Sequence, residues 1–163
     1  MNIVLHQPEI PQNTGNIGRT CMATGAALHL IEPLGFQLSD RQLARSGMDY
    51  WNELKPSRYV NFEDFRAKNP KGRVWMATTK AHRLYTDADF HPDDYIMFGK
   101  ESAGIPEEYL VEYEKTCIRI PMIENARSLN LSNAVAVVLY EALRQQAFAH
   151  LEKSGNLHRL KWE

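Results

Sequence analysis

Short apolar segments alternate with amphipathic segments along the whole chain, and this alternation constrains the fold more than any other feature. Strands are expected at Ile3–Leu5, Leu28–Glu32, Arg73–Thr78, Tyr95–Gly99 and Cys117–Pro121. Helices are expected to begin near Thr14, Ser39, Phe62, Pro106 and Ser132. Strands that alternate with helices form mostly parallel sheets covered on both faces. We therefore predict an α/β fold with a mostly parallel sheet and helices on both faces.

Length and composition point to one domain in a reducing compartment. The chain has 163 residues, enough for a single core, and we expect residues 1–163 to form one domain with a short tail from about residue 150. Cys21 and Cys117 are too few for a disulfide framework or a structural zinc site. The start lacks a basic leader, and the longest apolar stretch, Ala134 to Tyr140, is far shorter than the roughly 20 residues of a membrane span. These features predict a cytoplasmic protein with no membrane partner.

The charge balance limits how the chain could bind nucleic acid. Nineteen Lys and Arg residues face 20 Asp and Glu residues, which gives a net charge of -1. Many nucleic-acid-binding proteins carry a basic excess instead. An RNA partner would require positive charge gathered on one face.

The stretch from Ile120 to Gln146 combines a strand end, a polar loop and a long helix. Asn130 or Ser132 is expected to cap this helix. An apolar stripe at helical spacing predicts its buried face: Val135, Val138, Leu139 and Ala142. Asn133, Val137 and Tyr140 share another face. The stretch fits either a ligand-facing loop or a plain core helix in which the Tyr140 hydroxyl finds one partner.

A second polar junction, Gln7 to Thr20, follows the first predicted strand. Loops at the carboxyl ends of parallel strands bind ligands in open α/β sheets. Asn13 or Thr14 is expected to cap the helix, and Asn16 and Arg19 share a face of its first turns. The glycines lack the spacing of a dinucleotide fingerprint. The alternative is a capped helix with a solvated Arg19.

The third junction runs from Tyr95 to Glu108. Gly99 and Gly104 predict a tight loop that a flat ligand could approach, and Pro106 fits the first turn of the next helix. Lys80, with the nearby His82 and Arg83, forms a candidate anion-facing patch or a mobile loop. The histidines are scattered without metal-ligand spacing, so no metal is predicted.

A predicted short helix adds two further basic candidates. Arg41 and Arg45, four residues apart, could face phosphate or water.

The three junctions together resemble a known family. NTGNIGRT, FGKESAGIP and IPMIENARSLNLSNAVAVVLYEALRQ are similar to the three motifs of the SPOUT methyltransferases, in order and at family spacing. The similarity is greatest to small TrmL-type enzymes, which 2'-O-methylate the ribose of the tRNA wobble nucleotide, a cytidine or modified uridine. It extends from the first strand to about Phe148. It implies a C-terminal trefoil knot, S-adenosylmethionine as cofactor, a homodimer, and a tRNA anticodon stem-loop as partner.

The resemblance also assigns roles to individual residues. The implied cofactor contacts are Ala77, Thr78, Gly99, Gly104, Ile120, Met122, Ser128 and Leu129. Asn16, Arg19 and Lys80 are the implied RNA contacts, and Arg19 and Tyr140 the implied catalytic residues. Arg19 is a poor base because a guanidinium keeps its proton under ordinary conditions, so we expect it to hold phosphate or stabilise developing alkoxide charge. Tyr140 would orient Arg19 or the target, and the proton acceptor stays open.

Two positions depart from the pattern of the most similar enzymes. Lys100 stands where many have proline, and Ala103 where several have arginine or threonine, so loop shape and tRNA contacts are expected to differ. The alternatives are 2'-O-methylation of another tRNA position or of rRNA, or a non-catalytic RNA-binding dimer of the same fold. The segment that includes Lys153, Arg159 and Trp162 could touch RNA or pack on the partner subunit.

Overall fold

The computed structural model describes residues 1–37 and 51–162 and contains one six-stranded sheet. The strands are β1 (Asn2–His6), β2 (Ala27–Ile31), β3 (Ser57–Tyr59), β4 (Val74–Ala77), β5 (Tyr95–Phe98) and β6 (Cys117–Ile118). Their order is β3-β2-β1-β5-β4-β6, and every neighbouring pair is parallel. The predicted parallel α/β fold is confirmed.

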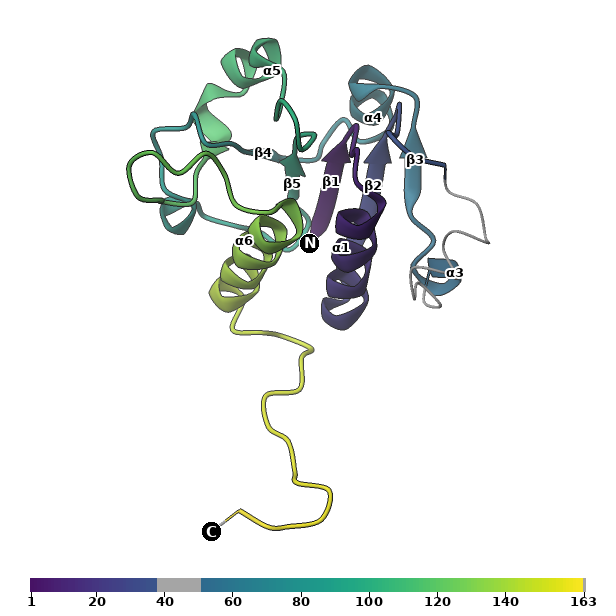
Figure 1. Cartoon of the computed structure of the whole chain (residues 1–163), viewed down its shortest axis with the longest axis vertical. Coiled ribbons are helices and arrows are strands. Elements are labelled where there is room, and N and C mark those ends of the chain that lie inside the picture. Colours follow the sequence, from purple (N-terminus) through teal and green to yellow (C-terminus); the bar gives the residue numbers. More distant parts are fainter. Residues whose placement is uncertain (38–50, 163) are drawn as a thin grey trace.

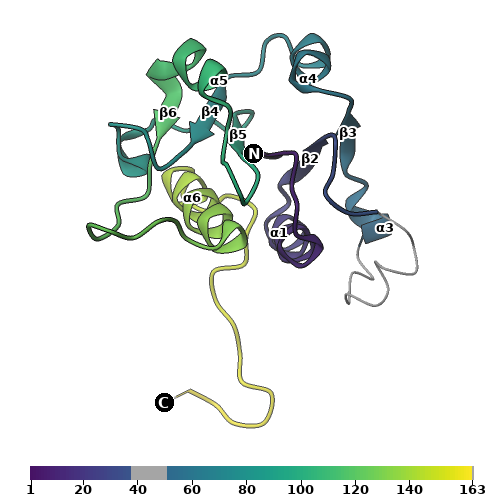
Figure 2. The same cartoon turned by 45° about the horizontal axis from the view of Figure 1, so that its top comes forward.

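Helices cover both faces of this sheet, as predicted (Figures 1 and 2). The helices are α1 (Pro11–Thr24), α3 (Trp51–Leu54), α4 (Phe62–Lys68), α5 (Glu107–Glu112) and α6 (Leu131–Gln145), with 3-10 turns η1 (Tyr85–Asp87) and η2 (Glu114–Thr116). Helices α1 and α6 lie on one face, and α4 and α5 lie on the other. No helix in the described part of the chain is long and apolar enough to cross a membrane.

Alternation along each strand builds two apolar clusters, one on each face. In β1, Ile3 and Leu5 join the cluster beneath α1 and α6, whereas Val4 joins the cluster beneath α4 and α5. Both clusters include fully buried side chains, such as Leu139 from α6 and Phe65 from α4. Burying each such side chain contributes about 1.5–3 kcal/mol, so both faces stabilise the sheet. Strands buried on both faces read as continuous apolar runs, which is why the sequence reveals them.

The start of α1 corrects one prediction. The helix begins at Pro11 rather than near Thr14, and neither Asn13 nor Thr14 caps it. Ile10 occupies the cap position and makes no side-chain cap bond. Its backbone N–H instead donates to the Glu101 carboxylate at 3.3 Å. A carboxylate from a distant loop therefore takes the place of the expected local cap.

Strand β3 and the end of β6 also differ from the prediction. β3 was not expected; it has three residues, and only Tyr59 is buried. β6 ends at Ile118 instead of Pro121, and the next residue, Arg119, pairs with Leu84 in an isolated bridge. The helix expected from Ser39, with Arg41 and Arg45, lies outside the described residues.

The two cysteines belong to the two apolar clusters, one in each. Cys21 and Cys117 are free and buried. Burial raises the pKa of the Cys21 thiol to about 12, so this side chain stays protonated and packs as a small apolar group.

Asp94, at the amino-terminal edge of the sheet, carries a stability prediction. Its carboxylate accepts hydrogen bonds from Arg73, from Trp75 and from the backbone N–H of His91. Burial alone would raise the pKa of Asp94, but these hydrogen bonds outweigh it and lower the pKa below its usual value. Asp94→Asn should lower the free energy of unfolding at neutral pH by about 2–4 kcal/mol, because the charged hydrogen bonds of this buried carboxylate are lost.

The pH dependence of this effect follows from the lowered pKa. The stabilisation is present above the unfolded aspartate pKa of about 3.9 and is lost as the pH falls through the lower folded value. Urea unfolding of wild type and Asp94→Asn should therefore differ most at neutral pH and converge in acid. Asp93→Asn, an exposed neighbour, is the control. An equal difference at both pH values would contradict the assignment.

Candidate active site

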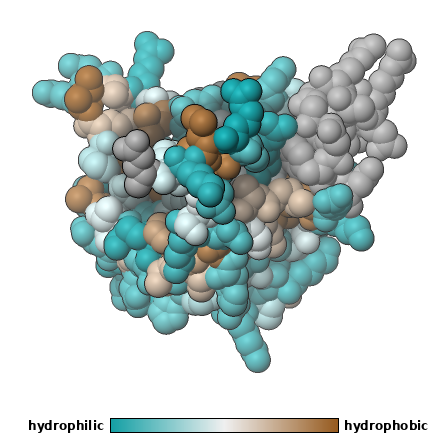
Figure 3. All heavy atoms as spheres, turned by 90° about the horizontal axis from the view of Figure 1, so that it is seen from below, coloured by the Kyte–Doolittle hydropathy of each residue, from teal (hydrophilic) through white to brown (hydrophobic). Residues whose placement is uncertain are grey.

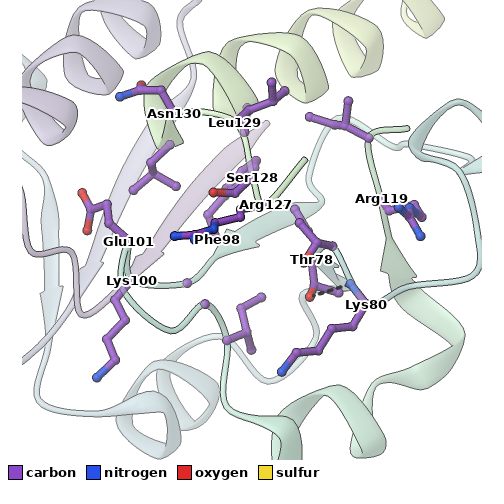
Figure 4. Close-up of a pocket in the computed structure, with 18 of the residues that line it drawn as sticks. Thr78, Lys80, Phe98, Lys100, Glu101, Arg119, Arg127, Ser128, Leu129 and Asn130 are labelled. Atoms are coloured by element: carbon purple, nitrogen blue, oxygen red, sulfur yellow. Dashed lines mark hydrogen bonds between the residues drawn. The ribbon is translucent and has the colours of Figure 1, made fainter. Parts of the chain in front are cut away.

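A cavity of about 660 Å³ opens at the carboxyl ends of β4, β5 and β6. This is the edge of a parallel sheet at which α/β proteins bind ligands. Several stretches of chain line it, including Ile10 and Asn13 near the start of α1. Figure 4 labels side chains from four other stretches: Thr78 and Lys80; Phe98, Lys100 and Glu101; Arg119; and Arg127 to Asn130. The start of α6 forms one wall, through Leu131, Ala134 and Val138. The second and third sequence motifs therefore meet at one space.

The eight residues expected to contact a cofactor all line this cavity. They are Ala77, Thr78, Gly99, Gly104, Ile120, Met122, Ser128 and Leu129. Lys80 lines it as well. The structure brings them together from segments up to about 50 residues apart in the chain. Their role in binding stays a prediction.

The loop from Gly99 to Gly104 is closed by its own backbone. Lys100 and Gly104 form an isolated antiparallel bridge, and the N–H of Gly104 donates to the carbonyl of Lys100 at 2.8 Å. Gly104 has a φ of 73°, which favours glycine. A Cβ on Gly99 would lie 2.0 Å from the carbonyl carbon of Gly104. Only glycine at position 99 permits this approach, as the predicted tight loop requires.

Two carboxylates join this loop to the start of α1. Glu101 accepts hydrogen bonds from the backbone N–H of Glu9 at 2.8 Å and from the side-chain amide of Asn13 at 3.0 Å. In return, the Glu9 carboxylate accepts from the backbone N–H and the hydroxyl of Ser102. The hydrogen bonds from Ser102 lower the pKa of Glu9. The first and second motifs are therefore held in one geometry.

Asn13 extends this network to α6. Its side-chain oxygen accepts from the amide of Asn130 at 3.0 Å. The oxygen of Asn130 in turn accepts from the backbone N–H groups of Ser132 and Asn133, so the predicted Asn130 cap is confirmed. All three motifs are thus linked from Glu101 through Asn13 to Asn130. Local sequence gave no sign of the long-range roles of Asn13 and Glu101.

The cavity is rich in cationic side chains. Lys80, Lys100, Arg119 and Arg127 line it, whereas Glu101 is its lining carboxylate among the described residues. The Glu101 oxygens already accept three N–H groups. The uncommitted charge around the opening is therefore positive, which favours anionic groups such as phosphates.

Lys80 has a partner at this opening. Its ammonium lies 2.5 Å from a carboxylate oxygen of Glu107, in the first turn of α5. This hydrogen bond lowers the pKa of Glu107. Both side chains are more than half exposed. An exposed pair of this kind contributes little to stability, so another anion can compete for Lys80.

The remaining predicted residues lie outside the cavity lining. Asn16 and Arg19 are exposed on α1, and Tyr140 is 46% exposed on α6. Helix α6 is a capped core helix with Val135 and Val138 buried, as the alternative expected, but Tyr140 is not buried in it. Helices α1 and α6 pack side by side, so the three residues belong to adjoining helices (Figure 1). None of the three lines the cavity.

Residues 1–37 and 51–162 contain no candidate metal site. No cluster of three or more His, Cys, Asp or Glu side chains there could hold a metal ion.

Comparisons with known proteins identify the family. The SpoU rRNA Methylase family matches residues 1–140. The tRNA (cytidine(34)-2'-O)-methyltransferase of Saccharophagus degradans is 45% identical over 150 residues, which cover 91% of this chain and 97% of that protein.

Solved structures agree with this match. A structure from work on the 2-OH methylation of C/U34 on tRNA superposes with a TM-score of 0.84 at 43% identity, covering 90% of this chain and 96% of that one. The SpoU methyltransferase AviRb of Streptomyces viridochromogenes, in complex with AdoMet, superposes with a TM-score of 0.76 at 26% identity, covering 90% of this chain and 58% of that one. These matches confirm the predicted resemblance. The chain belongs to the SpoU rRNA methylase family.

Proposed function

We propose that this protein transfers a methyl group from S-adenosylmethionine to the ribose 2'-hydroxyl of the tRNA wobble nucleotide. The observation that carries the proposal is the single cavity in which the second and third motifs meet, held to the first motif by Glu101 and Asn13. The relatives that match almost the whole chain are named for this reaction. Methylation of another tRNA position or of rRNA is the alternative within the same chemistry.

The cavity fits S-adenosylmethionine in size and lining. Small-molecule sites span about 300–1,000 Å³ and are largely apolar, with a few polar groups that orient the ligand. Ile118, Ile120 and Leu129 supply apolar walls for an adenine ring. Thr78 and Ser128 supply hydroxyls, and the Gly99–Gly104 loop brings backbone close to the space. We assign the eight predicted cofactor residues to this pocket.

The chain's own residues would align the substrate. When bound, the cofactor supplies a sulfonium methyl group, which the ribose oxygen attacks in line. Arg19 holds the phosphate next to the target or stabilises charge that develops on the ribose oxygen. Tyr140, on the helix beside α1, orients Arg19 or the ribose, and Asn16 contacts RNA one helical turn from Arg19. Alignment of this kind supplies a large share of the rate of such a transfer.

We propose a homodimer because the predicted site is divided within one subunit. The cofactor cavity and the exposed Arg19 lie apart, and a partner's α1 would bring a second Arg19 to the opening. Exposed apolar side chains on and beside α1 and α6 support this surface: Ile10, Met22, Val137 and Tyr140. Burial of such side chains favours association. Light scattering of the purified protein tests this, and a monomer that is fully active would contradict it.

We also propose a C-terminal knot within one domain. After β6, the backbone of Arg119 exchanges hydrogen bonds with Arg83 and Tyr85 before the chain enters the cavity wall and α6. This contact between the segment that precedes α6 and the loop after β4 supports threading of the chain. All six strands lie in one sheet, which supports a single domain over residues 1–163. We propose a cytoplasmic location because the proposed substrate is tRNA.

One assay tests the proposed reaction directly. The protein is incubated with radiolabelled S-adenosylmethionine and tRNA from cells that lack the corresponding gene, and labelled riboses are mapped by nuclease digestion and mass spectrometry. Label on the wobble ribose is the expected result. Label at another tRNA position or only on rRNA would reassign the substrate, and cofactor binding without any transfer would favour a non-catalytic RNA-binding dimer.

The ion pair between Lys80 and Glu107 makes a separate prediction. If Lys80 contacts RNA phosphate, Glu107 competes for it, so Glu107→Gln should tighten tRNA binding by about two- to fivefold and steepen its salt dependence. Filter binding at several salt concentrations measures both effects. Glu108→Gln, an exposed carboxylate in the same turn, is the matched control. Equal tRNA affinities of Glu107→Gln and Glu108→Gln would show that Lys80 does not contact RNA.

A further inference from the structure

The segment from 152 to 162 extends away from the folded body. It leaves the end of α6 at the edge of the sheet opposite the cavity and runs as an extended chain (Figures 1 and 2). Phe148 and Leu151 pack against the apolar cluster beneath α6 and anchor its start. Every residue from 152 to 162 is exposed. The segment therefore has a fixed origin and a free surface along its whole length.

The charge of this segment is opposite to that of the remaining chain. Residues 153–162 contain Lys153, Arg159 and Lys161 and no Asp or Glu, a formal charge of +3, and Glu152 and Glu163 flank them. The chain as a whole has a net charge of -1, so its other residues together carry -4. A polyanion is attracted to this segment and repelled by the average charge of the body. The positive charge that an RNA partner requires is therefore gathered partly here.

The segment also exposes apolar and aromatic side chains. Leu160 and Trp162 are 75% and 71% exposed, and Leu157 is 37% exposed. On the face seen from below, apolar side chains lie among polar ones (Figure 3). Indole rings stack on unpaired bases, and arginine binds phosphate or stacks beside them. Trp162 with Arg159 and Lys161 is a set of side chains suited to single-stranded or looped RNA.

We propose that residues 153–162 form an RNA-binding arm that holds the substrate tRNA outside the catalytic cavity. This inference rests on the proposed function for the identity of the RNA. An extended run from 152 to 162 spans at most about 36–40 Å. That length is close to the width of the domain, for which a radius of gyration of about 15 Å is expected. The arm can therefore reach RNA that enters a cavity on the far side of the body.

The charge favours RNA over a second copy of this chain as the occupant. Docking on another copy could pair the three cations with carboxylates, since the residues outside 153–162 carry a net charge of -4, but the cost of desolvating such buried pairs offsets most of the gain. RNA instead pairs each cation with a phosphate and leaves the aromatic ring free to stack. Packing on a partner subunit is the competing outcome that the experiment must distinguish.

The test compares the full chain with a chain that ends at Leu151 and with Trp162→Ala and Arg159→Gln/Lys161→Gln. We expect the shortened chain to bind unmodified tRNA about tenfold more weakly, with a higher KM for tRNA and an unchanged kcat. The salt slope of binding should fall by roughly two to three, for three lost phosphate contacts at about 0.7–0.9 each. Trp162→Ala should weaken binding without changing the salt slope. The double variant should weaken binding and also reduce the salt slope, by roughly 1.4–1.8 for two lost phosphate contacts.

Matched controls separate the arm from general charge effects. Lys71→Gln/Lys115→Gln removes two exposed cations from the body and should leave tRNA affinity within about twofold of wild type. Affinity for S-adenosylmethionine and the melting temperature should not change in the shortened chain, because every residue from 152 to 162 is exposed. An unchanged tRNA affinity and salt slope would overturn the proposal, as would conversion of a dimer to a monomer on shortening. Failure of methyl transfer by the full chain would instead reject the proposed function. The tRNA affinities and salt slopes would still decide whether residues 153–162 bind RNA.

Discussion

Replacing Arg19 with alanine will reduce methyl transfer to tRNA by at least about 10²–10³-fold while leaving the affinity for S-adenosylmethionine within about twofold. Removal of one preorganised group that stabilises developing charge commonly has a rate effect of this size. Cofactor affinity should survive because Arg19 does not line the cavity. Single-turnover transfer of labelled methyl and calorimetric titration of the cofactor measure the two quantities separately.

Two further variants define what Arg19 supplies. Arg58→Ala removes an exposed arginine from β3, where it pairs with Glu32 at 2.7 Å, and should change the rate by less than about twofold. Arg19→Lys keeps the charge but loses the planar fork that binds phosphate through two N–H groups, so it should recover only part of the activity. Loss of cofactor binding in Arg19→Ala would contradict a role directed at RNA and place the side chain in the cofactor site.

Features that depend on neighbouring residues were predictable from the sequence. β1, β2, β4 and β5 were found because both of their faces are buried, which produces continuous apolar runs. The Asn130 cap was predictable because the backbone N–H groups that donate to its side-chain oxygen lie only two and three residues away. β3 was missed because only one of its three residues is buried.

Features that depend on distant residues were not predictable. The contact between Asn13 and Glu101 joins positions 88 apart, and that between Asn13 and Asn130 joins positions 117 apart. Asn13 was therefore interpreted as a local cap, whereas the folded chain uses it as a bridge. The eight cavity residues were named through family resemblance, since neither periodicity nor spacing shows which loops of a sheet will meet. The sequence therefore predicts the helices, the strands and their buried faces, whereas the position of the site becomes visible only in the folded chain.

Gly99 provides the second large expected effect. Gly99→Ala should weaken S-adenosylmethionine binding by at least about 100-fold and lower the free energy of unfolding by about 1–3 kcal/mol, as overpacking does. The new Cβ would lie 2.0 Å from the carbonyl carbon of Gly104 and 2.2 Å from the nitrogen of Ile105. Both are backbone atoms, which cannot rotate away as a side chain would. The whole loop from Gly99 to Gly104 must move, and this loop lines the cavity.

A graded set of glycine variants isolates this steric cause. Gly104→Ala meets no atom within 4 Å but imposes a φ of 73° on alanine, a cost of about 1–2 kcal/mol, so its effect should be intermediate. Gly155→Ala has open space and no positive φ, so cofactor affinity should not change. Cofactor titration and thermal unfolding should show the largest loss for Gly99→Ala, a smaller loss for Gly104→Ala and none for Gly155→Ala. Equal cofactor affinity in Gly99→Ala and Gly155→Ala would show that the close approach of the loop does not shape the cofactor site. Because Glu101 lies within the displaced loop and binds Glu9 and Asn13, the same substitution should also disturb the start of α1 and reduce methyl transfer beyond the loss of cofactor binding.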